Sequence, residues 1–60
     1  MPFAEHQMVR LTRDVAGLTA GTVGVIVGVY GDGGFEVEVL SDGRTVAVLT
    51  VAETALEAVS

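Results

Sequence analysis

The chain has no cysteine, no lysine and no tryptophan, and its 60 residues include one proline and one histidine. Without cysteine it has no disulfide and no thiolate metal site, so its stability must come from a small core, an oligomer or a partner. No apolar run approaches the ~18 residues of a transmembrane helix, and the first residues lack the basic and apolar regions of a signal peptide. We therefore expect no membrane association and a cytoplasmic location.

Positive charge is also scarce. The only basic residues besides the histidine are Arg10, Arg13 and Arg44, against eight carboxylates, which gives a formal net charge of -5. The electrostatic field of a chain with this negative charge repels nucleic acid and anionic lipid. The absence of lysine and asparagine beside abundant alanine, valine and glycine is typical of a GC-rich bacterial genome.

Valine, threonine and glycine dominate what is present, and β-branched residues punctuated by glycine favour strands over helices. We expect one all-β domain over residues 1–60, with residues 1–6 as an N-terminal tail. The loop 14–21 carries Val15 and Leu18, which we expect to tuck into an open end of the fold. The expected strands are residues 7–13, 22–30, 35–40, a fourth from the Asp42-Gly43 turn to Val51, and 56–59 after a single helical turn at 52–55.

Two hairpins define the expected register. Asp42-Gly43 is a strong signal for a type I′ turn, and a two-residue loop there pairs Val39 with Val46 and Val37 with Val48 on the inner face. For the preceding hairpin, an odd loop over residues 31–33 keeps valine on that face, with Val29 opposite Phe35, Val27 opposite Val37 and Val25 opposite Val39. The turn and bend positions that we expect are Gly21, Gly24, Gly33, Asp42 and Gly43.

Five short strands, a bent second strand and a helical turn before the fifth favour a small five-stranded SH3-like barrel, whose closure shields the strand edges. The main alternative is an open meander that a second copy of the chain completes.

The same segments carry a resemblance to a known family. The pattern consists of Val9, Leu11, Thr12 and Asp14, then Leu18, Ala20, Gly21, Val23, Gly24, Ile26, Val27, Val29 and Tyr30, then 35–39 and 42–45. Over about residues 8–59 it resembles a bacterial family of small proteins described as domain of unknown function 4926. The resemblance implies an SH3-like fold and no assigned activity. Residues 21–24 are also similar to the short glycine-centred KOW pattern of ribosomal and transcription proteins.

Few residues carry catalytic or binding chemistry. Glu36 and Glu38 share a strand face about 7 Å apart. With Asp32 or Asp42 they suggest a divalent-cation site, a carboxylate pair for acid/base chemistry, or a solvated strand face, and we favour the solvated face. His6 is the only histidine, and the glycine-rich stretches precede no helix, so we expect no catalytic set and no phosphate loop. We predict that the protein is not an enzyme and that it binds no cofactor, no metal and no small-molecule substrate.

Apolar residues on both faces of two strands are the least ordinary feature. If the valines point inward, Ile26, Ala47 and Leu49 point outward, and Met8 joins them in a patch typical of a protein interface. We therefore expect a non-enzymatic protein-protein interaction module or small accessory subunit of a larger cytoplasmic protein, with a protein partner or a homo-oligomer. The alternative is a KOW-like nucleic-acid or ribosome-associated binding module, in which Arg10, Arg13 and Arg44 act with Tyr30 and Phe35.

Overall fold

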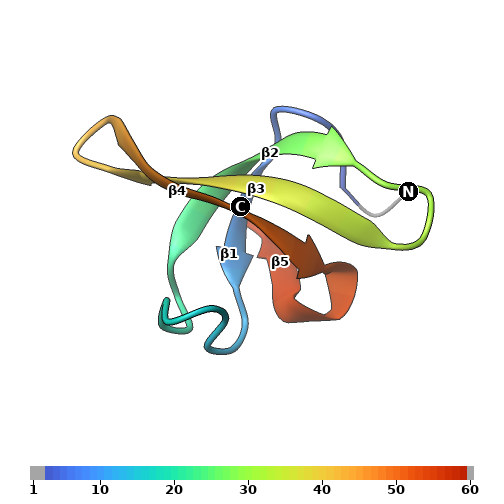
Figure 1. Cartoon of the computed structure of the whole chain (residues 1–60), viewed down its shortest axis with the longest axis horizontal. Helices are drawn as coiled ribbons and strands as arrows, with labels where there is room; N and C mark the ends of the chain where they lie inside the picture. The colour runs from blue at the N-terminus through green and yellow to red at the C-terminus, as the bar shows by residue number, and fades with distance from the viewer. Residues whose placement is uncertain (1–2, 60) are drawn as a thin grey trace.

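The computed structural model describes residues 3–59, which form a single five-stranded antiparallel sheet (Figure 1). The all-β class and the one helical turn before the last strand are confirmed. This 3-10 turn is the only helical segment of residues 3–59, so no helix there is long and apolar enough to span a membrane. The elements are β1 (Met8–Leu11), β2 (Val23–Val29), β3 (Gly34–Ser41), β4 (Arg44–Ala52), η1 (Glu53–Ala55) and β5 (Leu56–Ala58).

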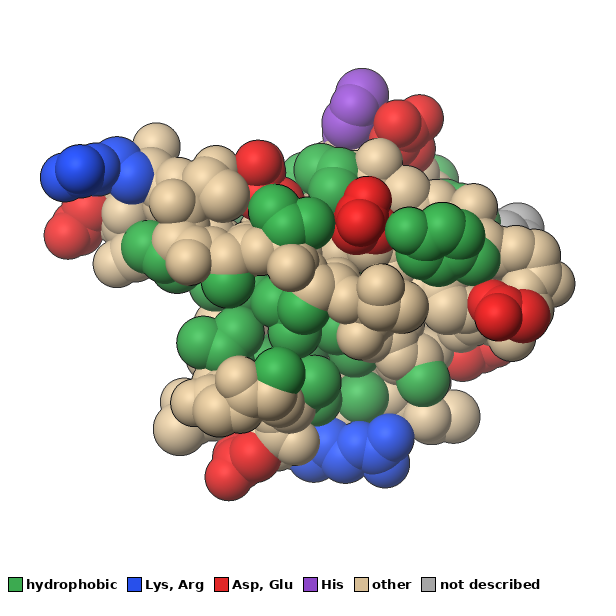
Figure 2. Space-filling model, in the orientation of Figure 1, with side chains coloured by type: hydrophobic (Ala, Val, Ile, Leu, Met, Phe, Trp, Pro, Cys, Tyr) green, Lys and Arg blue, Asp and Glu red, His purple; other side chains and the backbone are tan. Residues whose placement is uncertain are grey.

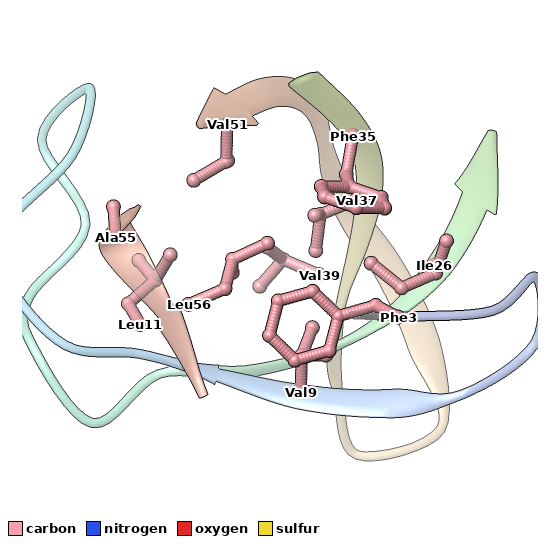
Figure 3. Packing of buried hydrophobic residues seen from close by; sticks show 10 residues of the cluster. All are labelled: Phe3, Val9, Leu11, Ile26, Phe35, Val37, Val39, Val51, Ala55 and Leu56. Carbon is pink, nitrogen blue, oxygen red and sulfur yellow. The ribbon is translucent and has the colours of Figure 1, made fainter. Parts of the chain in front are cut away.

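The strand order is β4-β3-β2-β1-β5, so β4 and β5 form the two edges. No ladder joins these two strands within residues 3–59, and the sheet is therefore open. The closed barrel that we expected is not confirmed. The sheet nevertheless curls around one core, and Figure 3 shows side chains pointing into it from the strands and the 3-10 turn. The buried hydrophobic residues are Phe3, Val9, Leu11, Ile26, Phe35, Val37, Val39, Val51, Ala55 and Leu56.

The N-terminal segment is part of this core. Phe3 is 8% exposed, and its ring meets that of Phe35 edge to face, with centroids 5.3 Å apart. The segment is also hydrogen-bonded to β2: the His6 N–H donates to the Ile26 carbonyl at 2.7 Å, and the Ile26 N–H donates to the Gln7 carbonyl at 2.9 Å. The expectation of a tail is therefore wrong for residues 3–6, while residues 1–2 lie outside the described residues.

The β3–β4 hairpin has the expected turn but another register. Asp42 and Gly43 have φ angles of 53° and 75°, and Ser41 pairs with Arg44, as a type I′ turn requires. Two pairs further on, the register shifts: Leu40 pairs with Thr45, but Val39 pairs with Ala47, which leaves Val46 as an extra residue in β4. Compared with a ladder without a bulge, one extra residue in β4 moves the side chains that follow it in that strand to the opposite face of the sheet.

The bulge reverses the faces that we expected for β4. Val46 and Val48 are 58% and 53% exposed, whereas Ala47 and Leu49 are partly buried and pack against the core. The pairs Val39 with Val46 and Val37 with Val48 are therefore wrong.

The β2–β3 hairpin shows the same kind of shift. Its loop has the expected odd length, because the Tyr30 N–H donates to the Gly34 carbonyl at 2.9 Å across residues 31–33, and Val29 pairs with Phe35. A register shift between Ile26 and Gly28 then leaves Val27 as the extra residue and sets Ile26 opposite Val37. Ile26 is consequently 0% exposed, and our expectation that it points outward is wrong.

Gly24 lies inside β2, opposite Val9 and Val39, and not in a turn. A Cβ at this position would lie 2.6 Å from Val37 Cγ1 and 2.8 Å from the Glu38 carbonyl oxygen. Gly24 therefore lets β2 approach β3 more closely than any side chain would permit. The other expected turn glycines, Gly21 and Gly33, do have left-handed φ angles of 93° and 89°, and Val15 and Leu18 pack against the core as expected.

We expect Gly24→Ala to lower the free energy of unfolding by about 1–3 kcal/mol, because the added methyl group overpacks the contact with β3. Gly31→Ala is the matched control, since no atom lies within 4 Å of a Cβ there, and it should be neutral or stabilise by up to about 1 kcal/mol. Urea unfolding followed by circular dichroism measures both. Equal midpoints for the two variants would contradict the close approach.

Phe3→Ala should lower the free energy of unfolding by about 3 kcal/mol or more, which is the usual loss when a buried phenylalanine is removed. In a domain this small the result can be complete unfolding. Tyr30→Ala, which removes an aromatic ring that is 43% exposed, should cost less than ~1 kcal/mol. If both variants have the same unfolding temperature as the wild type, the N-terminal segment is not part of the core.

Candidate interaction surface

Strand β4 forms a long and unprotected edge of the sheet. It spans nine residues, Arg44–Ala52, and within residues 3–59 it pairs only with β3. Arg44, at its start, is its only charged residue, and it contains no proline. Proteins usually blunt such edges with lysine, proline, a bulge or a short strand. Here the bulge at Val46 leaves the segment from Ala47 onward regular, whereas the opposite edge, β5, has only three residues.

The backbone groups that this edge presents follow from the ladder. In an antiparallel pair both backbone groups of a residue point to one neighbour, and successive residues alternate. Because the Gly34 carbonyl accepts the Tyr30 N–H, Gly34 faces β2. Phe35 and Val37 then face β4, where their partners are Val51 and Leu49.

Val48 and Thr50 alternate with these partners along β4, so they direct their N–H and C=O groups away from the sheet. No other element of residues 3–59 pairs with them. The edge therefore offers two residues whose four backbone groups are available for another strand.

The side chains of this edge are apolar or uncharged on both faces of the sheet. On the outer face, turned away from the core, Val48 is 53% exposed and Thr50 is also exposed. On the inner face, Ala47 and Leu49 are only partly buried. Figure 2 shows the projecting β3–β4 hairpin with hydrophobic atoms on and beneath it. An added strand would thus find apolar side chains on either side.

The four residues that we expected to form one interface are not brought together. Met8 does lie on the outer face and is 49% exposed, but it belongs to β1, which β2 and β3 separate from β4. Ala47 and Leu49 lie on the inner face, and Ile26 is in the core. The exposed valines of β4 were missed because nothing in the alternation of valine marks the bulge that turns them outward.

The acidic side chains of the outer face do not gather into a metal-binding cluster within residues 3–59. Glu38 accepts a hydrogen bond from the Thr45 hydroxyl at 2.9 Å, and Glu36 lies opposite Gly28 and Thr50. Residues 3–59 contain no group of three potential metal ligands, and they enclose no pocket. Glu36 and Glu38 are both half-buried on this face.

Two of the residues that we grouped for nucleic-acid binding, Phe35 and Arg10, have other contacts in the structure. Phe35 is 0% exposed and cannot stack on a base. The Arg10 guanidinium pairs with the Glu57 carboxylate at 2.9 Å, while Arg44 lies on the far side of the sheet, at the start of the edge strand. The basic side chains visible in Figure 2 lie at two separate places on this face of the molecule.

Comparison with known proteins identifies a family but no function. A family model described as Domain of unknown function (DUF4926) matches residues 5–58. The chain belongs to this family, since the match covers most of its length. No curated protein and no solved structure matches it.

We expect no retention of single-stranded RNA or DNA by the protein at ~0.15 M salt, because scattered arginines cannot neutralise many phosphates against eight carboxylates. Fluorescence anisotropy with a labelled oligonucleotide measures this directly. Sub-micromolar binding that weakens steeply with added salt would support the KOW-like alternative instead.

Proposed function

We propose that this member of the DUF4926 family is a small, non-enzymatic protein-interaction module that binds its partner by adding a strand to β4. In this proposal it is an accessory chain of a cytoplasmic bacterial protein, and its fold is SH3-like. The order of five short strands, with a 3-10 turn between β4 and β5, supports that fold. The absence of cysteine supports that location.

One observation carries the proposal: Val48 and Thr50 direct unpaired backbone groups away from the part of β4 that has no charged side chain, residues 45–52. In strand addition, main-chain hydrogen bonds supply affinity and alternate side chains supply specificity. Each such hydrogen bond contributes a net ~0.5–1.5 kcal/mol, and completing the burial of Val48, which is 53% exposed, contributes roughly half of the ~1.5–3 kcal/mol of a fully buried side chain. These contributions favour pairing along β4 and oppose the cost of about 4–15 kcal/mol for the translational and rotational freedom that association removes.

A variant at the outer-face residue Met8 distinguishes strand addition at β4 from binding of the partner to the outer face of the sheet. Met8 and Val48 are similarly exposed, at 49% and 53%, and both are apolar. Strands β1 and β4 lie three places apart in the sheet, which corresponds to about 14 Å at ~4.8 Å per strand. A lysine at Met8 therefore adds the same charge without reaching the edge.

Val48→Lys should weaken association of the protein with its partner by at least about tenfold, or ~1.4 kcal/mol, because lysine on an edge strand opposes pairing. Met8→Lys should leave it unchanged. Association is measured by capture on immobilised protein and by sedimentation, which detects binding between copies. Thr50→Pro, which removes an outward N–H, should act like Val48→Lys.

Thermal unfolding of each variant verifies that the fold is intact. If Val48→Lys and Thr50→Pro associate as the wild type does, strand addition at β4 is wrong. If Met8→Lys alone loses binding, the outer face and not the edge is the docking surface.

A further inference from the structure

We propose, building on the function proposed above, that the strand added to β4 is β4 of a second copy, antiparallel about a two-fold axis at Leu49. The two open sheets then join into one continuous sheet across the dimer. Edge β5 takes no part, since it has three residues and carries Glu57 in an ion pair with Arg10.

Charge favours β4 as the place where two copies meet. Each chain has a formal net charge of -5, so most surfaces of two copies repel one another. Strand β4 contains no carboxylate from Arg44 to Ala52. It is a stretch of the sheet where copies approach without opposing acidic groups.

The residues at the two ends of β4 select the antiparallel direction. Arg44 opens the strand and Glu53 follows directly after it. Antiparallel pairing brings Arg44 of one copy to the same end as Glu53 of the other, at both ends of the joint. Parallel pairing would instead bring like charges together, which is unfavourable.

The regular part of the strand sets the register. The bulge at Val46 precedes it, and Ala52, the N-cap of η1, ends it. The run between them is residues 47–51, whose centre is Leu49. A two-fold axis there pairs Val48 with Thr50 of the second copy, and Thr50 with its Val48, which uses the outward N–H and C=O groups of both residues in each copy. Any other register sets one end of the run against a bulge or a 3-10 turn.

The same register completes the burial of Leu49. Its backbone faces β3, so the two Leu49 residues form a non-hydrogen-bonded pair, in which Cα atoms lie about 4.5 Å apart. Their side chains then meet on the inner face, where Leu49 is only partly buried in one copy alone. Leu49 and Ala47, which the sequence suggested as interface residues, become contacts of the dimer from the inner side.

Single cysteines test both the partner and the register, because the chain has none of its own. Leu49→Cys places two thiols at a Cα separation within the ~4.4–6.8 Å range of disulfides. Val48→Cys and Thr50→Cys are matched controls one residue away, and Met8→Cys reports random collision. Under mild oxidation Leu49→Cys should form a disulfide-linked dimer at least about tenfold faster than each control, equivalent to ~1.4 kcal/mol in activation free energy.

Sedimentation equilibrium of the cysteine-free protein gives a second, independent readout. We expect twice the chain mass at high concentration, dissociation to monomer in Val48→Lys, and no change in Met8→Lys. A wild type that stays monomeric, with Leu49→Cys no faster than Met8→Cys, overturns the two-fold dimer. Fastest cross-linking at Val48 or Thr50 overturns the register at Leu49.

These outcomes remain distinct from failure of the proposed function. If the protein is monomeric but Val48→Lys still loses a captured protein, strand addition at β4 stands and the partner is a different chain. If neither self-association nor capture depends on Val48, both proposals fall together.

Discussion

The rest of the sheet depends on how β3 pairs with its two neighbours. Strands β2 and β4 each contain one extra residue, a bulge, in their pairing with β3. Val27 in β2 and Val46 in β4 are both unpaired against β3, whose own alternation from Phe35 to Val39 is uninterrupted. These two bulges decide that Ile26 and Leu49 face the core side and that Val48 faces solvent. Gly24 then lets β2 close on β3 without a side chain between them. The curl of the sheet and the exposed edge both depend on this pairing.

Local signals in the sequence predicted the elements well. The Asp42-Gly43 turn, the odd loop at 31–33 and the helical turn before β5 each depend on a few adjacent residues with strong backbone preferences. The bulges were not predictable, because both β2 and β4 carry apolar residues at consecutive positions and either face of such a strand can be buried. The place of Phe3 was missed for another reason: its contact with Phe35 joins residues far apart in sequence.

For the candidate site, the sequence indicated an excess of apolar side chains but assigned them to the wrong surface. Exposure of Met8 was predicted from its strand alone, whereas that of Val48 depends on the bulge before it. That β4 is an edge is a property of strand order, which no single strand encodes. The interaction surface that we propose is made of backbone groups and therefore leaves little trace in residue types, since its main requirement is the absence of charge and proline.

The pairing of β1 with β5 has a consequence for how the chain folds. The β2–β3–β4 meander closes through two short loops, and β1 pairs with β2 across residues 12–22. Strand β5 pairs only with β1, its partner from the other end of the sequence, with Val9 opposite Ala58. Closing so long a loop carries a large entropic cost before any contact repays it. Folding should therefore begin in the meander and finish with the docking of β5 on β1, so β4 is exposed as a pairing edge from the earliest ordered state onward.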